Sequence, residues 1–362
     1  MTNQLLSTIY YNPEHEGSFS TAKKLYEAAK LVDSKITLKG TQKWLSGELT
    51  YTLHKPARKR FKRNPVIVSH IDEQWQADLI DLQEFQSQNR GYRYILTIID
   101  IFSKYAFVIP MKTKTSEAVT SAFKQVFTHR KPTKLQTDKG KEFVNSLLQS
   151  FLKQESVYFF TSKNPDIKCS IIERFNRTLK ARMFKYFTSK GTRRYLEVLD
   201  QLVTAYNNTV HSATKFRPSA VTKENEREVF QNLCGKQSLR DLLLARKVSR
   251  SKLTLGDTVR QKYHIGPFEK SYHPLWSDQL FTVTNKLTGP TQSLYKLKTA
   301  DNTILDRRFY PEEVQKVRYT LHRVEKVLKR RKRAGLSEYY VKWLNYPSSF
   351  NSWIPATDIV NL

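Results

Sequence analysis

Cysteine, acidic residues and long apolar runs are all scarce in this 362-residue chain. The two cysteines, Cys169 and Cys234, stand in unrelated contexts, so the sequence offers neither a disulfide framework nor a cysteine-based zinc site, and it fits a reducing compartment. No apolar run approaches the ~18 residues that a membrane span needs, and the N-terminus lacks a basic stretch followed by an apolar one. The sequence therefore predicts a soluble, intracellular protein without membrane contact.

The scarcity of acids leaves a large positive charge. The chain has 62 Lys and Arg residues against 33 Asp and Glu residues, a formal net charge of +29. A field of this size attracts polyanions, so we expect DNA or RNA as the partner and binding that weakens steeply with salt. The length suggests about two to three domains, each large enough to bury its own core.

Three of the few acids stand in distinctive settings: Asp78 in WQADL, Asp138 in LQTDKGKEF and Glu173 in IIERFNRTLK. We expect the first in a strand, the second at a strand end and the third in a long helix, which can bring them together. Carboxylates that converge without a cation repel one another. Mg²⁺ prefers oxygen ligands, and a pair of ions can serve both the attacking and the leaving oxygen in phosphoryl transfer. The pattern predicts a two-metal site acting on nucleic acid.

Each of these acids has a simpler interpretation when taken alone. An Asp at a strand end is commonly a cap, and a Glu in a basic helix is commonly a surface ion-pair partner. The order and flanking motifs of all three favour the joint site. The acids Asp81, Asp100 and Glu142 lie nearby, and Asp100 is expected to be structural because it sits in a turn between strands.

The N-terminal part predicts a helical domain over residues 1–54, with helices between about 18 and 48 and a break around Gly40. Short basic helices fit a helix-turn-helix module, and a plain helical bundle is the alternative. A basic linker follows over residues 55–69. It is expected to contact the DNA backbone or to direct nuclear import, unless it is simply solvated. Its candidate DNA-binding residues are Arg58, Lys59, Arg60, Lys62 and Arg63.

The central part, residues 70–220, alternates strand and helix patterns. Three strand-like runs, DLIDL, YRYILTIIDIF and KYAFVIPMK, precede a helix with Ser116 as its expected N-cap. Further strands and helices then alternate, which predicts a mixed-sheet α/β domain. A linker helix is expected over 221–249, and short strands separated by Gly, Pro and Asn predict a small all-β barrel over 250–317.

The motifs WQADL, TIIDIFSKYAFVIP, TDKGKEF and ERFNRTLK, with 34 residues between the second and third acids, resemble the D,D-E catalytic core of retroviral-type integrases. The resemblance implies an RNase H-like fold and an SH3-like barrel after it. It implies that Asp78, Asp138 and Glu173 are catalytic and bind two Mg²⁺ ions, for which Mn²⁺ may substitute. It also implies DNA contacts by three residues on the helix of the third acid, Asn176, Arg177 and Lys180. Lys139, beside the second acid, is a further candidate for DNA binding, and a solvated loop lysine is its alternative.

The segment 318–362, with HRVEKVLKRRKR, EYYVKWLNYP and NSW, resembles a chromodomain. That family binds methylated lysine in an aromatic cage. The cage positions here are His322, Trp343 and Tyr346, where His322 replaces the usual aromatic residue unless Tyr319 takes its place. The alternative is a chromodomain that has become a DNA- or protein-binding module.

The first 70 residues hold His15, His54 and His70 but no cysteine, so the zinc module of retroviral integrases is not expected and no zinc is predicted. The whole arrangement resembles integrases of Maverick/Polinton transposons and virophages. It implies 3′-end processing and strand transfer of linear element or viral DNA into host DNA by a homodimer or homotetramer. The expected location is the host nucleus, or a virion, with histone tails or chromatin as further partners. A non-catalytic chromatin- or DNA-binding protein and an RNase H-like nuclease without joining activity remain the alternatives.

Overall fold

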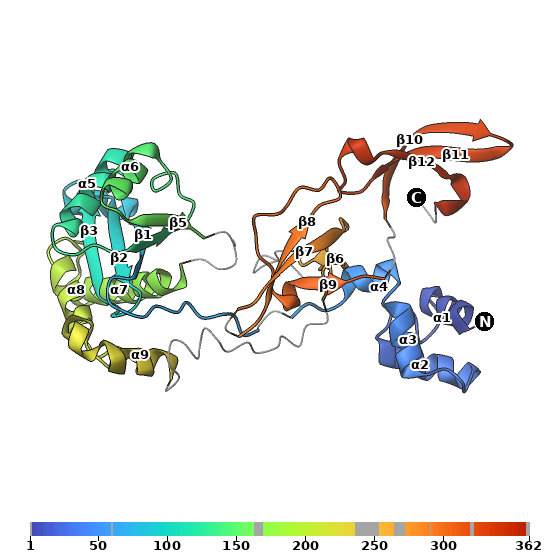
Figure 1. Cartoon of the computed structure of the whole chain (residues 1–362), viewed down its shortest axis with the longest axis horizontal. Helices are drawn as coiled ribbons and strands as arrows, with labels where there is room; N and C mark the ends of the chain where they lie inside the picture. Colours follow the sequence, from blue (N-terminus) through green and yellow to red (C-terminus); the bar gives the residue numbers. More distant parts are fainter. Residues whose placement is uncertain are drawn as a thin grey trace. The chain divides into compact units, whose positions relative to one another are not determined.

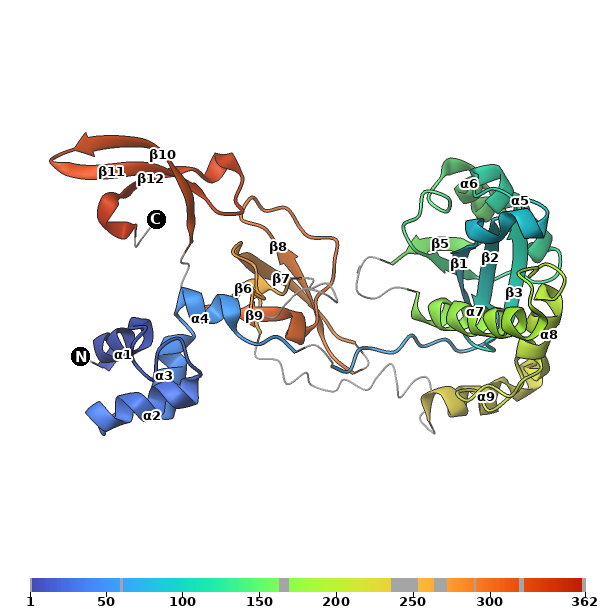
Figure 2. The same ribbon diagram turned by 180° about the vertical axis from the view of Figure 1, so that it is seen from behind.

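The computed structural model divides into two compact units, Pro65–Ala245 and a second unit formed by Met1–Asn64 with Arg246–Leu362 (Figures 1 and 2). Lys59, Arg60, Tyr319 and residues 236–249, about half of the predicted linker helix, lie outside the residues that it describes. The described residues are 2–58, 61–162, 169–235, 253–263, 272–289, 291–318 and 322–359.

The Pro65–Ala245 unit is built on a five-stranded mixed sheet with the strand order β3-β2-β1-β4-β5. The first three strands form an antiparallel meander, and β4 runs parallel to β1 and to β5. The strands are β1 (Gln74–Asp81), β2 (Tyr94–Asp100), β3 (Ala106–Met111), β4 (Lys134–Thr137) and β5 (Tyr158–Thr161). Every residue of β2 is buried, as its nearly continuous apolar run requires when helices cover both faces.

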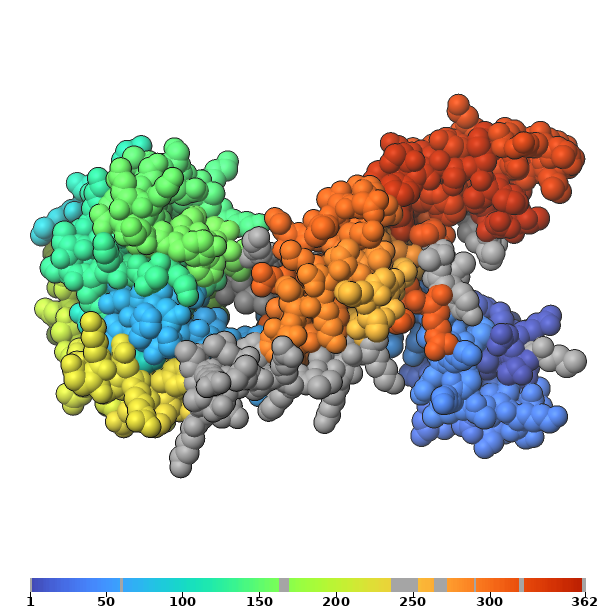
Figure 3. All heavy atoms as spheres, in the orientation of Figure 1, coloured from blue at the N-terminus to red at the C-terminus, as the bar shows by residue number. Residues whose placement is uncertain are grey.

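Helices pack on both faces of this sheet because its apolar residues alternate between them. Leu96 and Ile98 of β2 pack with α5 and α6, whereas Ile95 and Ile99 pack with α7 and α8. In the space-filling view these layers form a filled body coloured from light blue to yellow (Figure 3). The helices are α5 (Ser116–Phe127), α6 (Ser146–Gln154), α7 (Ser170–Lys190), α8 (Leu199–Asn207) and α9 (Glu226–Cys234).

The N-terminal segment is helical, with eight buried apolar residues forming its core. Its helices are α1 (Thr2–Tyr11), α2 (Ala22–Val32), α3 (Leu38–Leu45) and α4 (Leu49–His54). The first of these was not predicted, although its Leu6, Ile9 and Tyr10 are buried. Across the described residues, no helix combines the length and the apolar character needed to cross a membrane.

Two local predictions about helix ends were wrong. The N-cap of α5 is Thr115, whose hydroxyl accepts a hydrogen bond from Ala118 N, and Ser116 is the first helical residue. Gly40 does not separate two helices but lies inside α3, because the Thr37 hydroxyl accepts from Gly40 N and caps the helix before the glycine. The break falls instead at 46–48.

The C-terminal region is rich in antiparallel sheet. One sheet has the order β8-β7-β6-β9, with Val259, Phe281 and Tyr295 in its core. Its strands are β6 (Thr258–Gln261), β7 (Phe281–Leu287), β8 (Leu294–Lys298) and β9 (Val314–Lys316). A second sheet has the order β10-β11-β12, formed by Val324–Arg333, Leu336–Trp343 and Ser352–Pro355. Within the described residues, β12 is followed by a short 3₁₀ turn, Ala356–Asp358.

Candidate active site

Asp78 lies on β1 and faces α7, because alternate residues of the strand point to opposite sides of the sheet. Its neighbour Ile80 on the same face packs with α7, whereas Ala77 packs on the other side. The half-buried carboxylate accepts two hydrogen bonds, from Leu79 N to Oδ1 at 2.8 Å and from Asn176 Nδ2 to Oδ2 at 2.9 Å. Both bonds hold the side chain in one orientation.

Burial raises the pKa of Asp78, and repulsion from Asp138 and Glu173 raises it further, to about 6. The hydrogen bonds from Leu79 N and Asn176 oppose that rise without cancelling it. A carboxylate whose charge is disfavoured by two others must lie close to both of them. The structure therefore brings the three predicted acids together at one place.

Asp138 and Glu173 are both exposed, in contrast to Asp78. Asp138 follows the last residue of β4, and its Oδ1 accepts from Gly140 N at 3.0 Å. Glu173 lies in the first turn of α7, where the free N–H groups of the helix favour a negative side chain. Two of the three carboxylates are thus open to solvent and to a ligand.

Three glutamines connect the elements that carry the acids. Gln76 Oε1 accepts from Ile171 N and Ile172 N at 3.2 and 3.1 Å, and so caps α7, whose own N-cap residue supplies no side-chain bond. Gln76 Nε2 and Gln74 Nε2 each donate to Gln136 Oε1 at 3.0 Å. Gln76 and Gln136 are paired neighbours, each two residues before an acid. This network sets β1, β4 and α7 relative to one another.

Sequence reasoning missed the glutamine network, although one feature pointed to it. Gln74, Gln76 and Asp78 are polar residues at alternate positions of an otherwise buried strand. A buried polar group needs a hydrogen-bond partner, so such a row predicts partners on the element that covers it. The identity of those partners requires the three-dimensional structure.

The donor set at the acids suits a hard divalent cation. It consists of carboxylate oxygens, and Asn176 Oδ1, beside Asp78, is buried without a hydrogen-bond partner in the described structure. Oxygen ligands of this type match Mg²⁺ or Mn²⁺. Among the described residues, no three His, Cys, Asp or Glu side chains already stand at metal-binding separation. The chemistry of the residues fits the metal, and their mutual repulsion favours a cation between them.

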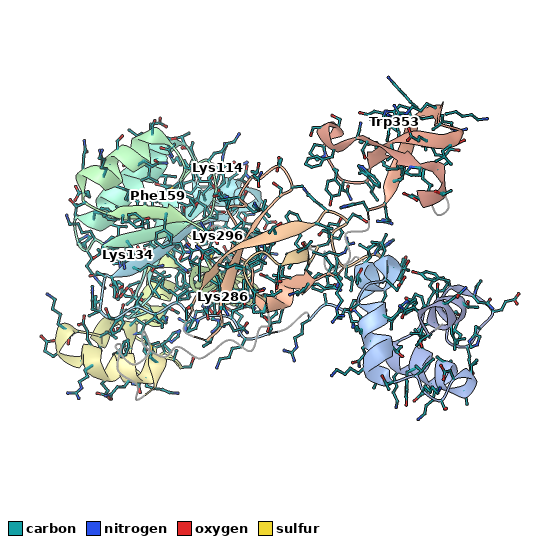
Figure 4. The ribbon with its side chains drawn as sticks, turned by 45° about the vertical axis from the view of Figure 1, so that its right-hand side comes forward. Lys114, Lys134, Phe159, Lys286, Lys296 and Trp353 are labelled. Carbon is teal, nitrogen blue, oxygen red and sulfur yellow. The ribbon has the colours of Figure 1, made fainter. Side chains whose placement is uncertain are left out.

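The predicted DNA-contacting residues fall in two places. Arg177, Lys180 and Lys139 are exposed around the acids, whereas Asn176 is buried and donates to Asp78. The linker residues Arg58, Lys62 and Arg63 belong to the other compact unit, where their side chains are exposed. That unit adds further cations on its sheet, including Lys286 and Lys296 of β7 and β8, labelled in Figure 4.

The predicted cage rings also gather. The His322 ring lies 5.7 Å from that of Trp343 and 5.0 Å from that of Tyr346, between ring centroids. Tyr346 is only 8% exposed, and its hydroxyl accepts from Leu280 N at 2.9 Å. Burial, and then the nearby Arg260, lower the pKa of His322. The Tyr346 ring is thus held against the residue that precedes β7.

Known families match the central part and the C-terminal part of the chain. Residues 69–163 match the Integrase core domain family, and residues 322–362 match the Chromo (chromatin organisation modifier) domain family. A transposon-derived protein of Caenorhabditis elegans is 34% identical over 212 residues, which cover 58% of this chain and 68% of that protein. The Pol polyprotein of Radiation murine leukemia virus is 30% identical over 134 residues, 36% of this chain and 23% of the polyprotein.

A solved structure agrees at the level of the fold. A chain of the simian T-cell lymphotropic virus intasome, in complex with PP2A regulatory subunit B56 gamma, superposes with a TM-score of 0.57 at 16% identity. The match covers 81% of this chain and 95% of that one. Fold and motifs together define an RNase H-like integrase core with a helical N-terminal part, a sheet-rich C-terminal region and a chromodomain, as predicted. The chain belongs to the family of transposon-derived proteins with an integrase core domain.

Proposed function

We propose that this protein is a DNA integrase, a polynucleotidyl transferase with endonuclease activity that processes the 3′ ends of linear element or viral DNA and joins them to host DNA. The observation that carries the proposal is the convergence of Asp78, Asp138 and Glu173, whose repulsion adds to burial in raising the pKa of Asp78 to about 6. A carboxyl group with a perturbed pKa beside other acids is characteristic of a catalytic site.

Asp78, Asp138 and Glu173 would hold the divalent ions, with Mg²⁺ the expected metal and Mn²⁺ a substitute. When bound, a pair of such ions activates the attacking oxygen and stabilises the leaving oxygen of the phosphodiester. The protein's own contribution is to position the reactants. The Leu79 N–H and the Asn176 amide orient Asp78, and the glutamine bonds hold α7, and with it Glu173, against β1.

Exposed cations supply the second requirement, which is to hold the DNA. Arg177, Lys180 and Lys139 stand around the acids, where they would contact phosphates and fix the register of the DNA end. Arg58 to Arg63 and the overall charge of +29 would add backbone contacts that are not specific for sequence.

The wider setting follows from the same proposal. Pairing two DNA ends requires at least two protomers, so we expect a homodimer or homotetramer on DNA. The site of action would be the host nucleus, with delivery in a virion as a further route. The chromodomain would direct the complex to histone tails or other chromatin components.

The test is an assay with a labelled linear DNA end, a plasmid target and Mg²⁺, run in parallel with Asp138→Asn. The proposal expects covalently joined product that the substitution abolishes. Cleavage without joining would instead identify a nuclease. Tight DNA or chromatin binding with no chemistry in either protein would identify a non-catalytic chromatin-binding protein.

A further inference from the structure

A pocket lies on the flank of α7 opposite Glu173. Its volume is about 450 Å³, and it is bounded by α7, the end of α8 and the chain that follows α8. Arg174, Thr178 and Arg182 line it from α7 at four-residue intervals, which places them in one stripe along the helix. Asn176 and Glu173 lie on the other flank, so the pocket is separate from the cluster of acids.

The lining of the pocket is strongly cationic. Lys104, Arg174 and Arg182 contribute positive charge, His211 lies beside them, and no carboxylate is among the lining residues. Burial and then repulsion from Lys104 and Arg174 lower the pKa of His211, which shows that these groups share one positive field.

Lys104 is the most constrained of these residues. Its side chain is 8% exposed, and its Nζ donates to Ile101 O at 2.6 Å. Its pKa is lowered to about 8 by burial above all, with Arg174 adding to the effect and Asp100 opposing it. Asp100 does not pair with Lys104 alone, because Arg130 Nη2 also lies 3.6 Å from Asp100 Oδ2. A buried cation in this position retains uncompensated charge.

The backbone of Lys104 is also unusual. Its φ of 67° lies in the left-handed region, which a long side chain rarely adopts. The turn is closed by a hydrogen bond from Lys104 N to Asp100 O at 2.9 Å. Such strain persists only where surrounding contacts enforce it, and it is concentrated at functional sites. Here it directs a lysine to the wall of the pocket.

We propose that this pocket binds a phosphate group. Arginine and lysine match the charge of phosphate and arginine can bond it in a bidentate manner, while the hydroxyl of Ser170 offers a further donor. The rings of Phe175 and Tyr206 line the same space, which leaves room for the group attached to the phosphate. That group is either the DNA backbone or a small phosphorylated molecule such as a nucleotide.

The experiment uses the full chain in a chelator, so that its outcome is independent of any joining activity. Inorganic phosphate is titrated against potassium chloride of equal ionic strength, and the thermal midpoint and the ³¹P line width are followed. The variants are Arg174→Gln and His211→Gln. The matched control is Lys185→Gln, an exposed cation of α7 outside the pocket.

The proposal expects a saturable response in the wild type and in Lys185→Gln, with affinity about tenfold weaker in Arg174→Gln and His211→Gln, as for the loss of one charged hydrogen bond. Equal responses in all four proteins would overturn it, because phosphate would then be adsorbing to the cationic surface in general.

A second arm distinguishes the two sources of phosphate. Affinities for thymidine 5′-monophosphate and for metal-free duplex DNA are measured with the same proteins. Weakened duplex binding in the two pocket variants assigns the pocket to the DNA backbone. Weakened nucleotide binding with duplex binding retained assigns it to a small molecule. If both variants retained both affinities, the proposal that this pocket binds phosphate would be contradicted.

Discussion

The two flanks of helix α7 carry opposite excess charge. On one flank, repulsion from Asp138 and Glu173 adds to burial in raising the pKa of Asp78. On the other flank, burial lowers the pKa of Lys104 and of His211, and repulsion from Arg174 lowers both further. Sequence neighbours on one helix thus take part in clusters of opposite sign. The difference supports two proposed ligands of opposite charge, a divalent cation on one flank and a phosphate group on the other.

The largest expected effect is a difference in DNA joining between substitutions at the neighbouring residues Glu173 and Arg174. Glu173→Gln should lower DNA joining by roughly a thousandfold, because it removes one of the metal-binding carboxylates. Arg174→Gln should lower joining by no more than about tenfold, because it acts on phosphate binding alone. Rates of strand transfer on a plasmid target measure both. Equal losses in the two variants would mean that the flanks do not have separate roles.

The next effect concerns the glutamine that fixes α7 beside the sheet. Gln76→Ala leaves Ile171 N and Ile172 N without their acceptor, and should lower the free energy of unfolding by about 1–3 kcal/mol. Gln74→Ala loses only the bond to Gln136 and should cost about 1 kcal/mol or less. Urea unfolding compares them. If Gln76→Ala were as stable as the Gln74→Ala control, the capping of α7 by Gln76 would not contribute to stability.

The cationic flank can be examined through pH. The folded pKa of Lys104 is about 8, below the ordinary lysine value of 10.5, so its contribution to stability is present above pH 10.5 and is lost as pH falls through 8. As pH falls from 10.5 to 8, the free energy of unfolding of the wild type should therefore fall by up to about 3 kcal/mol relative to that of Lys104→Met. Paired urea titrations across this range measure the difference. A difference in stability between the two proteins that does not change with pH would show that Lys104 has an ordinary pKa. Saturating phosphate should reduce the loss of stability in the wild type.

The smallest effects are expected from the exposed cations beside the acids. Arg177→Gln and Lys180→Gln should change the free energy of unfolding by less than about 0.5 kcal/mol. A plot of the logarithm of DNA affinity against the logarithm of salt concentration should have a slope that is shallower by about 0.9 in each variant, because one phosphate contact is lost. Fluorescence anisotropy over a salt series checks this. An unchanged slope in both variants would place the DNA elsewhere.

Much of the fold was predictable because it depends on patterns local in sequence. The apolar run YRYILTIIDIF predicted the strand β2, and WQADL, TDKGKEF and ERFNRTLK indicated the three acids together with their elements. The Ala334–Gly335 turn, with both φ values positive, joins strands that the chromodomain resemblance also predicted.

The rest depends on contacts between distant residues. Gln76 meets Ile171 and Ile172 across 95 or more positions, and no local pattern indicates that partner. Helix ends are ambiguous for a related reason, because Thr115 and Ser116 are both good caps and only the final geometry selects one. The left-handed turn that buries Lys104 was not predicted, because KYAFVIPMK indicates a strand and no special turn.

The most direct test of the account is the stability of the wild type and Asp138→Asn, each with a chelator and with Mg²⁺. The account predicts that Asp138→Asn is the more stable protein in chelator, because one repelling charge is gone, and that Mg²⁺ stabilises the wild type but not the variant. A variant that is less stable in chelator and still stabilised by Mg²⁺ as strongly as the wild type would contradict a metal-binding cluster of these three acids.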